Sequence, residues 1–166
     1  IIVNLYPFEE TIMNKNNSFD DCIEQIDIGG PTLMRAAAKN FQDIILLSSP
    51  DQIKLFCNQI LKTSTLSLGI RKNLAKEAFR ITSFYESVIA NWFNKDDLDF
   101  LSNNNTTIPM KKIRNLRYGE NPHQKASLYK YGSNEINQIS GKEISYNNIV
   151  DLDVAINLAH EFEKPS

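Results

Sequence analysis

Two stretches near the start of the chain hold side chains suited to proton transfer. Asn4 and Tyr6 follow an apolar triplet, and Asp27 stands before Gly-Gly-Pro at residues 29–31, with Lys39 further along. Two glycines before a proline let backbone N–H groups point outward at a helix N-terminus, which suits an anion. Tyr, Asp and Lys exchange protons when burial and mutual charge bring their pKa values toward neutrality. A plainer interpretation stays open, because such a turn and a lysine near a helix C-terminus are common without any catalysis.

A second polar segment, Leu116 to Gln124, has the composition of a turn. Arg117 offers a planar fork of donors that suits a phosphate or carboxylate. His123 lies between Pro and Gln, which favours a structural role over acid–base chemistry, and His160 is expected at a surface or in packing. His, Cys, Asp and Glu nowhere have metal-ligand spacing in the sequence, so no metal site is predicted. The sequence also lacks a nucleotide-binding glycine loop and a nucleophile elbow.

Alternating strands and helices are expected to position the proton-transfer residues near the start of the chain. Ile1 to Val3 and Asp43 to Ser49 are continuous apolar runs, typical of parallel strands that are covered on both faces. Ser18 with Asp21 forms a capping box, and an Ala-rich helix is expected over 31–40. This order predicts an α/β layered domain with a parallel sheet.

Amphipathic helices dominate the rest of the chain. Ser49 and Gln52 form a second capping box before a helix. Further elements are expected at 70–94 (helix), 125–131 (strand) and 147–163 (helix), with a polar linker at 102–107. The apolar stripes of the helices comprise Ile53, Phe56, Cys57, Ile60 and Leu61, then Leu74, Ala78, Ile81, Tyr85, Val88 and Trp92, then Ile149, Leu152, Ala155, Ile156 and Ala159.

Bulk properties are those of a globular protein in a reducing compartment. The net charge is −2 over 166 residues, which gives no overall basic field for nucleic acid. No apolar run approaches the roughly 20 residues that cross a bilayer, so we expect a cytoplasmic protein without a membrane partner. Cys22 and Cys57 lie on apolar stripes and are expected to be buried free thiols. The chain opens on an apparent buried strand without Met, so we expect sequence upstream. A basic cluster expected to be solvated consists of Lys111, Lys112, Arg114 and Arg117.

Five motifs occur in register along the chain: Asn-Leu-Tyr-Pro-Phe at 4–8, Glu-Gln-Ile-Asp-Ile-Gly-Gly at 24–30, Arg-Ala-Ala-Ala-Lys-Asn at 35–40, Leu-Arg-Tyr-Gly-Glu-Asn-Pro-His-Gln at 116–124, and Ser-Tyr-Asn-Asn-Ile at 145–149. Together they resemble the bifunctional AICAR transformylase/IMP cyclohydrolase family over essentially the whole chain. The resemblance implies that residues 1–113 are the C-terminal part of a methylglyoxal-synthase-like cyclohydrolase domain, incomplete at its N-terminus, plus a linker. Residues 114–166 would then begin an α/β transformylase domain.

The resemblance also implies two reactions. A formyl group moves from the co-substrate 10-formyltetrahydrofolate to AICAR, and formyl-AICAR then closes to IMP with loss of water, without a cofactor. The ligands are small-molecule nucleotides, and the family implies a homodimer. The catalytic Lys-His pair of the transformylase would be expected shortly beyond residue 166. The isolated chain is therefore expected to be inactive in both reactions.

The family motifs also assign roles to individual residues. Lys39 would be the principal proton donor and acceptor of the cyclohydrolase, with Tyr6 and Asp27 beside it to orient and polarise the reacting groups. Base contacts would come from Val3, Asn4 and the Asp27–Ile28 backbone. Arg117 and Tyr118 match the pair that binds AICAR.

Two other classes of protein stay open on the sequence. One is a methylglyoxal-synthase-like domain that binds a phosphorylated ligand for regulation without catalysis, which would have no need of a proton shuttle at Lys39. The other is a structural or dimerisation fragment built on the long helix over 70–94.

Overall fold

The computed structural model describes residues 1–63, 65–95, 104–132 and 137–162. The chain divides into two compact units, Ile1–Pro109 and Met110–Ser166. The sequence-based boundary after residue 113 falls within strand β1 (Met110–Asn115). The assignment of the two parts to two catalytic domains stays a prediction.

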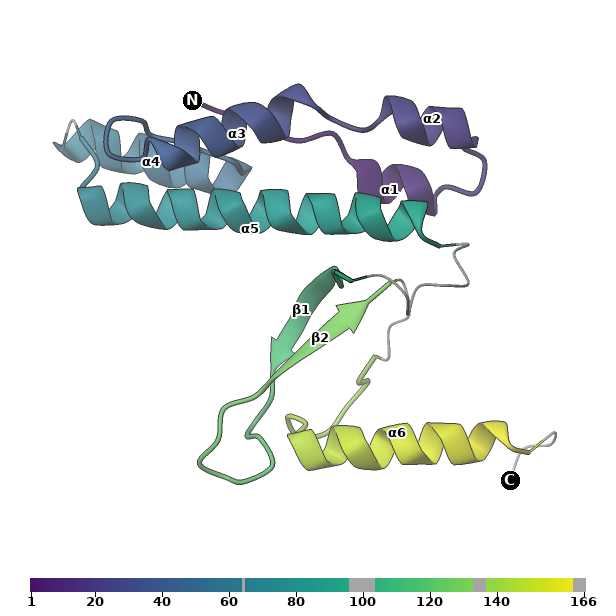
Figure 1. The fold of residues 1–166 in the computed structure, drawn as a ribbon. Helices are drawn as coiled ribbons and strands as arrows, with labels where there is room; N and C mark the ends of the chain where they lie inside the picture. The colour runs from purple at the N-terminus through teal and green to yellow at the C-terminus, as the bar shows by residue number, and fades with distance from the viewer. Residues whose placement is uncertain (64, 96–103, 133–136, 163–166) are drawn as a thin grey trace. The chain divides into compact units, whose positions relative to one another are not determined.

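The first unit is built on helix α5 (Leu68–Phe93), against which α3 (Gly29–Lys39) packs along its length (Figure 1). Ser67 caps α5, since its hydroxyl accepts a hydrogen bond from the Ile70 N–H. The predicted apolar stripe of this helix is confirmed, because every member is buried or half-buried. The remaining helices of the unit are α1 (Phe8–Met13), α2 (Phe19–Glu24) and α4 (Pro50–Thr63).

Local capping rules hold well in this unit. The predicted capping box of α2 is present: the Asp21 N–H donates to Ser18 Oγ at 3.1 Å, and the Ser18 N–H donates to Asp21 Oδ2 at 2.8 Å. At α4 only half of the predicted box forms. The Gln52 N–H donates to Ser49 Oγ at 3.3 Å, but Gln52 Oε1 accepts from the N–H of Ser48 at 2.7 Å, one residue earlier than expected.

The two predicted strands meet in a single parallel bridge between Ile2 and Leu47. The Val3 N–H donates to the Leu47 carbonyl at 3.0 Å, and the Leu47 N–H donates to that of Ile1 at 2.9 Å. The parallel direction agrees with the sequence. The terminal amino group of Ile1 also donates to the Ile45 carbonyl at 2.8 Å, and the described residues show no parallel ladder beyond this bridge. The chain is α/β, while the methylglyoxal-synthase-like layered sheet stays a prediction.

Three apolar clusters form the core of the first unit. Val3, Met34 and Leu46 centre the cluster between α3 and α5, and Phe8 and Trp92 centre the one between α1, α2 and α5. The third cluster joins α4 to α5 through partly buried side chains at the start of α4, including Ile53 and Phe56.

The predicted stripe of α4 is wrong at Cys57 and Leu61. Cys57 is exposed and Leu61 is 85% exposed, while Ile53, Phe56 and Ile60 are half-buried. Helical periodicity identifies a face of α4 but does not say how far the core extends along that face. The expectation of two buried thiols is therefore correct for Cys22 and wrong for Cys57.

The second unit contains an antiparallel hairpin and one helix. Strand β1 pairs with β2 (Ser127–Tyr131), with Lys112 opposite Tyr129 and a bulge between Lys112 and Arg114. The predicted strand over 125–131 is confirmed as β2, while β1 was not predicted. The last predicted helix is confirmed as α6 (Tyr146–His160), which begins with a complete capping box between Ser145 and Asn148.

Candidate active-site residues in the two units

The carboxylate of Asp27 organises the turn that leads into α3. Its Oδ1 accepts a hydrogen bond from the Gly30 N–H at 2.7 Å, and its Oδ2 accepts one from the Tyr6 N–H at 3.3 Å. The backbone that follows the first strand is thus tied to the first turn of α3 by one side chain. Of the predicted proton-transfer residues, the structure brings Tyr6 and Asp27 together, through the backbone of Tyr6.

Tyr85 holds the same turn from the other side. The Asp27 N–H donates to the Tyr85 hydroxyl at 2.8 Å, and that hydroxyl donates to the Gln25 carbonyl at 3.3 Å. Burial raises the pKa of Tyr85, which favours the protonated phenol that donates to Gln25. Sequence reasoning placed Tyr85 in the apolar stripe and missed this role. A tyrosine within a buried stripe was the available signal, because a buried phenol hydroxyl usually finds a polar partner.

The predicted base-contacting residues differ in what they can offer a ligand. Val3 is 8% exposed and its side chain belongs to the core, so it can contact a ligand mainly through its backbone. Asn4 is exposed, and Ile28, the N-cap residue of α3, is 75% exposed. The Asn4 side chain is thus open to a ligand, while the Ile28 carbonyl already accepts a hydrogen bond from Thr32 Oγ1 at 2.8 Å.

Lys39 lies in the last turn of α3 and is exposed. Since α3 begins at Gly29, Lys39 is about 13 Å along the helix axis from Gly30, at about 1.5 Å per residue. The Asp27 carboxylate contacts Tyr6 and the first turn of α3, whereas Lys39 lies in the last turn, so the helix separates the two ends of the predicted set.

In the second unit, Arg117 and Tyr118 form one structural pair. Arg117 Nη2 donates to the Tyr118 hydroxyl at 3.2 Å, and Arg117 Cζ lies 4.9 Å from the centroid of that ring. The pKa of Tyr118 is lowered, first by a hydrogen bond with the Ser145 side chain and then by the hydrogen bond and positive charge of Arg117. Ser145 was part of a recognised motif, but its contact with Tyr118 was not predicted.

The residues after this pair form a tight turn. The Gly119 N–H donates to the Gln124 carbonyl at 2.9 Å, and the Asn121 N–H donates to Gln124 Oε1 at 2.8 Å. A Cβ atom on Gly119 would lie 2.9 Å from Gln124 Cβ, so the close approach requires glycine at this position. His123 is exposed on the turn, which is compatible with the structural role expected from its position between Pro and Gln.

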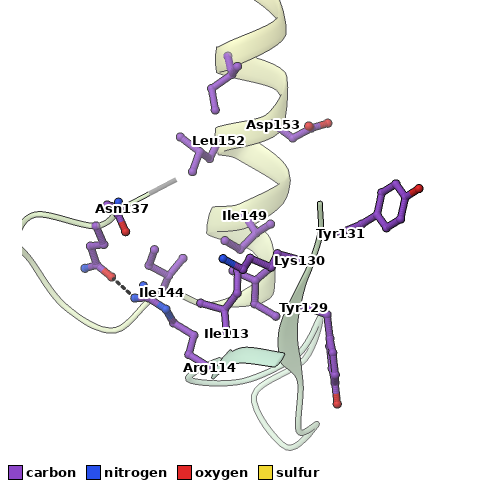
Figure 2. A pocket seen from close by; sticks show the side chains of 13 residues that line it. Ile113, Arg114, Tyr129, Lys130, Tyr131, Asn137, Ile144, Ile149, Leu152 and Asp153 are labelled. Carbon is purple, nitrogen blue, oxygen red and sulfur yellow. Dashed lines mark hydrogen bonds between the residues drawn. The ribbon is translucent and has the colours of Figure 1, made fainter. Parts of the chain in front are cut away.

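The described residues of the second unit line two clefts that could hold a ligand. One, of about 600 Å³, is lined by Arg117, His123 and Lys125 together with residues 115–116, 122, 124 and 126–127, and its cationic groups suit an anionic ligand. The other, of about 450 Å³, lies between the hairpin and α6 (Figure 2). Its walls are mainly apolar, with Ile113 facing Ile149 and Leu152, while Arg114 donates to Gln138 Oε1 at 3.2 Å at its edge. The first cleft is therefore the candidate nucleotide site of this unit.

The described residues contain neither a metal-binding cluster nor a membrane-spanning helix. Their His, Cys, Asp and Glu side chains do not gather in groups of three that could hold a metal ion. None of their helices combines the length and apolar character that crossing a bilayer requires.

Comparison with known proteins gives a consistent family. Residues 37–166 match the family described as AICARFT/IMPCHase bienzyme. The chain is 45% identical, over 179 aligned positions, to the bifunctional purine biosynthesis protein PurH of Caldicellulosiruptor saccharolyticus, covering 100% of this chain and 34% of that protein. It is 41% identical to the protein of the same name from Clostridium perfringens and 39% identical to that from Bacillus subtilis, covering 33% of each. The chain thus spans about a third of the length of the curated relatives it matches.

Proposed function

The chain belongs to the AICARFT/IMPCHase bienzyme family, and we propose that the protein containing it carries out the last two steps of de novo purine biosynthesis. In the first step the formyl group of 10-formyltetrahydrofolate passes to the amine of AICAR. In the second, formyl-AICAR closes to IMP with loss of water. The observation that carries this proposal is the 45% identity to a bifunctional relative over the whole chain.

Residues 1–113 contribute to the ring closure in this proposal. The carboxamide nitrogen of formyl-AICAR attacks the formyl carbon, and the resulting carbinolamine loses water. Lys39 transfers the protons, while Tyr6 and Asp27 orient and polarise the reacting groups. Base contacts come from Val3, Asn4 and the Asp27–Ile28 backbone. Because the closure is intramolecular, held geometry and proton transfer are most of what it requires.

The geometry around Asp27 supports an orienting role. Both carboxylate oxygens accept backbone N–H groups, so the side chain is fixed before any ligand arrives. The exposed phenol of Tyr6 and the exposed Asn4 lie on the segment that this carboxylate holds. Lys39 lies at the far end of α3, and the proposal therefore requires that the substrate extend along this helix or that Lys39 approach the site in the complete protein.

Residues 114–166 contribute to AICAR binding in the formyl transfer. Arg117 presents its guanidinium to the anionic part of the nucleotide, with Tyr118 stacked against it. The cleft lined by Arg117 and Lys125 supports this assignment with its two positive charges. Formyl transfer makes 10-formyltetrahydrofolate the co-substrate of this unit, whereas the ring closure uses none.

The proposal extends to the context of the protein. The first unit takes its place in a methylglyoxal-synthase-like layered domain, and the complete protein is a cytoplasmic homodimer. The 166 residues by themselves are inactive in both reactions, because they correspond to about a third of the relatives' length. Measurable transformylase turnover by the isolated chain would contradict this last point.

The test uses a protein of the relatives' full length that contains this chain. IMP formation from formyl-AICAR is measured for the parent, for Lys39→Ala and for Lys54→Ala, whose side chain is 78% exposed on α4 and serves as the matched control. We expect Lys39→Ala to lose about two to four orders of magnitude in rate, the range for a general acid–base group, and Lys54→Ala to retain parental activity.

Two results would change the proposal in different ways. A folded parent that binds IMP but forms none would favour the regulatory ligand-binding domain. Equal activity of the parent and Lys39→Ala would keep the reaction but remove Lys39 as the proton shuttle.

A further inference from the structure

The turn between α2 and α3 is held by a side chain from a third helix. Tyr85 of α5 places its hydroxyl against this turn, where the oxygen accepts the Asp27 N–H at 2.8 Å and the proton is donated to the Gln25 carbonyl at 3.3 Å. The single proton of the phenol is thus used once, and one hydroxyl satisfies two backbone groups of the turn.

The Tyr85 side chain is itself fixed by the core. It is 8% exposed and belongs to the apolar cluster that contains Phe8, Val88 and Trp92. The Phe8 ring meets it edge-on, with 6.3 Å between the ring centroids. Helix α5, which carries Tyr85, is 26 residues long and packs against both α1 and α3. The hydroxyl therefore has a defined position within the first unit.

This hydroxyl completes the restraints on Asp27. The backbone N–H of Asp27 bonds to Tyr85, while its carboxylate accepts the N–H groups of Gly30 and Tyr6. Holding a residue at its backbone and at its side chain determines where the carboxylate lies. A group that polarises a reacting atom must be held to within about 0.5 Å, by neighbours that are themselves locked by packing and hydrogen bonds. Tyr85 meets both conditions.

We propose that Tyr85 is a positioning residue for the ring closure: by bonding the backbone at Gln25 and Asp27, its buried hydroxyl keeps the Asp27 carboxylate in the position from which it polarises the reacting groups of formyl-AICAR. This inference rests on the proposed function of Asp27. Because its side chain is buried, Tyr85 acts through Asp27 and does not contact the substrate.

The experiment measures IMP formation from formyl-AICAR by variants of the full-length protein. Tyr85→Phe removes the hydroxyl and keeps the ring, whereas the matched control Val88→Ala removes apolar contacts from the same cluster and leaves the hydrogen bonds of the turn in place. We expect Tyr85→Phe to lower kcat about ten- to a hundredfold, because a misplacement of about 1 Å can cost a factor on that order. KM for formyl-AICAR should change less than about threefold, as for an interaction that matters mainly in the transition state. Val88→Ala should stay within about twofold of the parental kcat, although both variants unfold at a lower temperature.

A third variant tests the same link from the other side of Asp27. Gly30→Ala places a methyl group against the Asp27 carboxylate and should also lower kcat. Since Tyr85 and Gly30 would both act on the position of this one carboxylate, the double variant should lose less than the product of the two single losses.

Three results would overturn the inference: a parental kcat in Tyr85→Phe, an equal loss in Val88→Ala, or losses that multiply in the double variant. Circular dichroism at the assay temperature verifies folding. If Tyr85→Phe does not fold, Gly30→Ala decides alone, because a parental kcat there would show that the carboxylate need not be held in place. A parent that forms no IMP would refute the proposed function, and the inference with it.

Discussion

The carboxylate of Asp27 occupies the space that a side chain on Gly30 would need. Oδ1 of Asp27 accepts the Gly30 N–H at 2.7 Å, and a Cβ atom built on Gly30 would lie 2.4 Å from Oδ2. Gly29 differs, because nothing lies within 4 Å of a Cβ placed there. The Asp27 side chain therefore excludes a larger residue at position 30, whereas position 29 has room for one.

Substitution of these glycines by alanine should have opposite effects. Gly29→Ala should stabilise the first unit by about 0.5–1 kcal/mol, because alanine restricts the unfolded chain and favours the helix. Gly30→Ala should destabilise it by about 1–2 kcal/mol, since the Asp27 carboxylate must leave the helix N-terminus. Urea unfolding followed by the fluorescence of Trp92, the single tryptophan, measures both. Equal stability of the two variants would show that Asp27 moves aside without cost.

Replacement of Tyr85 by Phe should loosen the Asp27 turn. The Asp27 N–H loses its acceptor and the Gln25 carbonyl loses its donor, so we expect a loss of about 1–3 kcal/mol at neutral pH. The same unfolding measurement detects it. A matched control is Tyr6→Phe, because the Tyr6 phenol is 53% exposed and its bond to Asp27 uses the backbone. An equal loss in the control would contradict the special role of Tyr85.

The raised pKa of Tyr85 also predicts a pH dependence. The folded protein holds the phenol proton more tightly than the unfolded chain, whose tyrosine has a pKa near 10.0. This contribution to stability is complete below pH 10 and is lost as pH rises through the folded pKa. The parent should therefore lose stability more steeply than Tyr85→Phe above about pH 10. Parallel pH dependences for the two proteins would exclude this effect.

Phe8 should matter more to stability than Phe19, although both contact Trp92. The Phe8 ring is 1% exposed and meets Trp92 edge-on at 5.5 Å, whereas Phe19 stacks at 4.9 Å and is 57% exposed. Phe8→Ala should cost about 3–5 kcal/mol because it leaves a cavity. Phe19→Ala should cost about 0.5–1.5 kcal/mol, the value of an aromatic pair with little burial. Thermal unfolding that ranks the two variants in the reverse order would contradict the described core.

The ionisation of Tyr118 offers a direct measure of its neighbours. Because Ser145 and Arg117 lower its pKa, the phenol should ionise at lower pH than an unperturbed tyrosine, whose pKa is 10.0. Ser145→Ala should raise that pKa, and Arg117→Gln should also raise it. The difference in ultraviolet absorbance between each protein and its Tyr118→Phe counterpart isolates this one group during an alkaline titration. A Tyr118 pKa that is the same in both variants and the parent would contradict these contacts.

Features governed by neighbouring residues were predictable from the sequence. The capping box of Ser18 and Asp21, the end of α3 at Lys39 and the apolar face of α5 all depend on short-range spacing, and all are confirmed. Helix α6 was also predicted, over 147–163, and is found at Tyr146–His160; its capping box between Ser145 and Asn148 was not predicted.

Features that depend on distant partners were not predictable. Met-Lys-Lys-Ile-Arg-Asn at 110–115 has no clean alternation and becomes a strand only because β2 pairs with it. Tyr85 and Asp27 are 58 residues apart in the sequence, and helical spacing does not predict a contact over that separation. Cys57 was misassigned because periodicity gives the face of a helix, and not the extent of the core against it. At the candidate site, the sequence motifs identified the residues, but only the structure showed which other residues they contact.

The bridge between Ile2 and Leu47 has a practical consequence for handling the isolated chain. Ile1 and Val3 bond to Leu47, so in a parallel pair the backbone N–H and carbonyl of Ile2 point away from it. Ile1 and Ile2 are also 48% and 59% exposed. An open strand edge beside exposed isoleucines favours aggregation by edge-to-edge pairing. Preparations of the 166-residue chain should therefore be checked for self-association by sedimentation before a lack of turnover is attributed to missing catalytic groups.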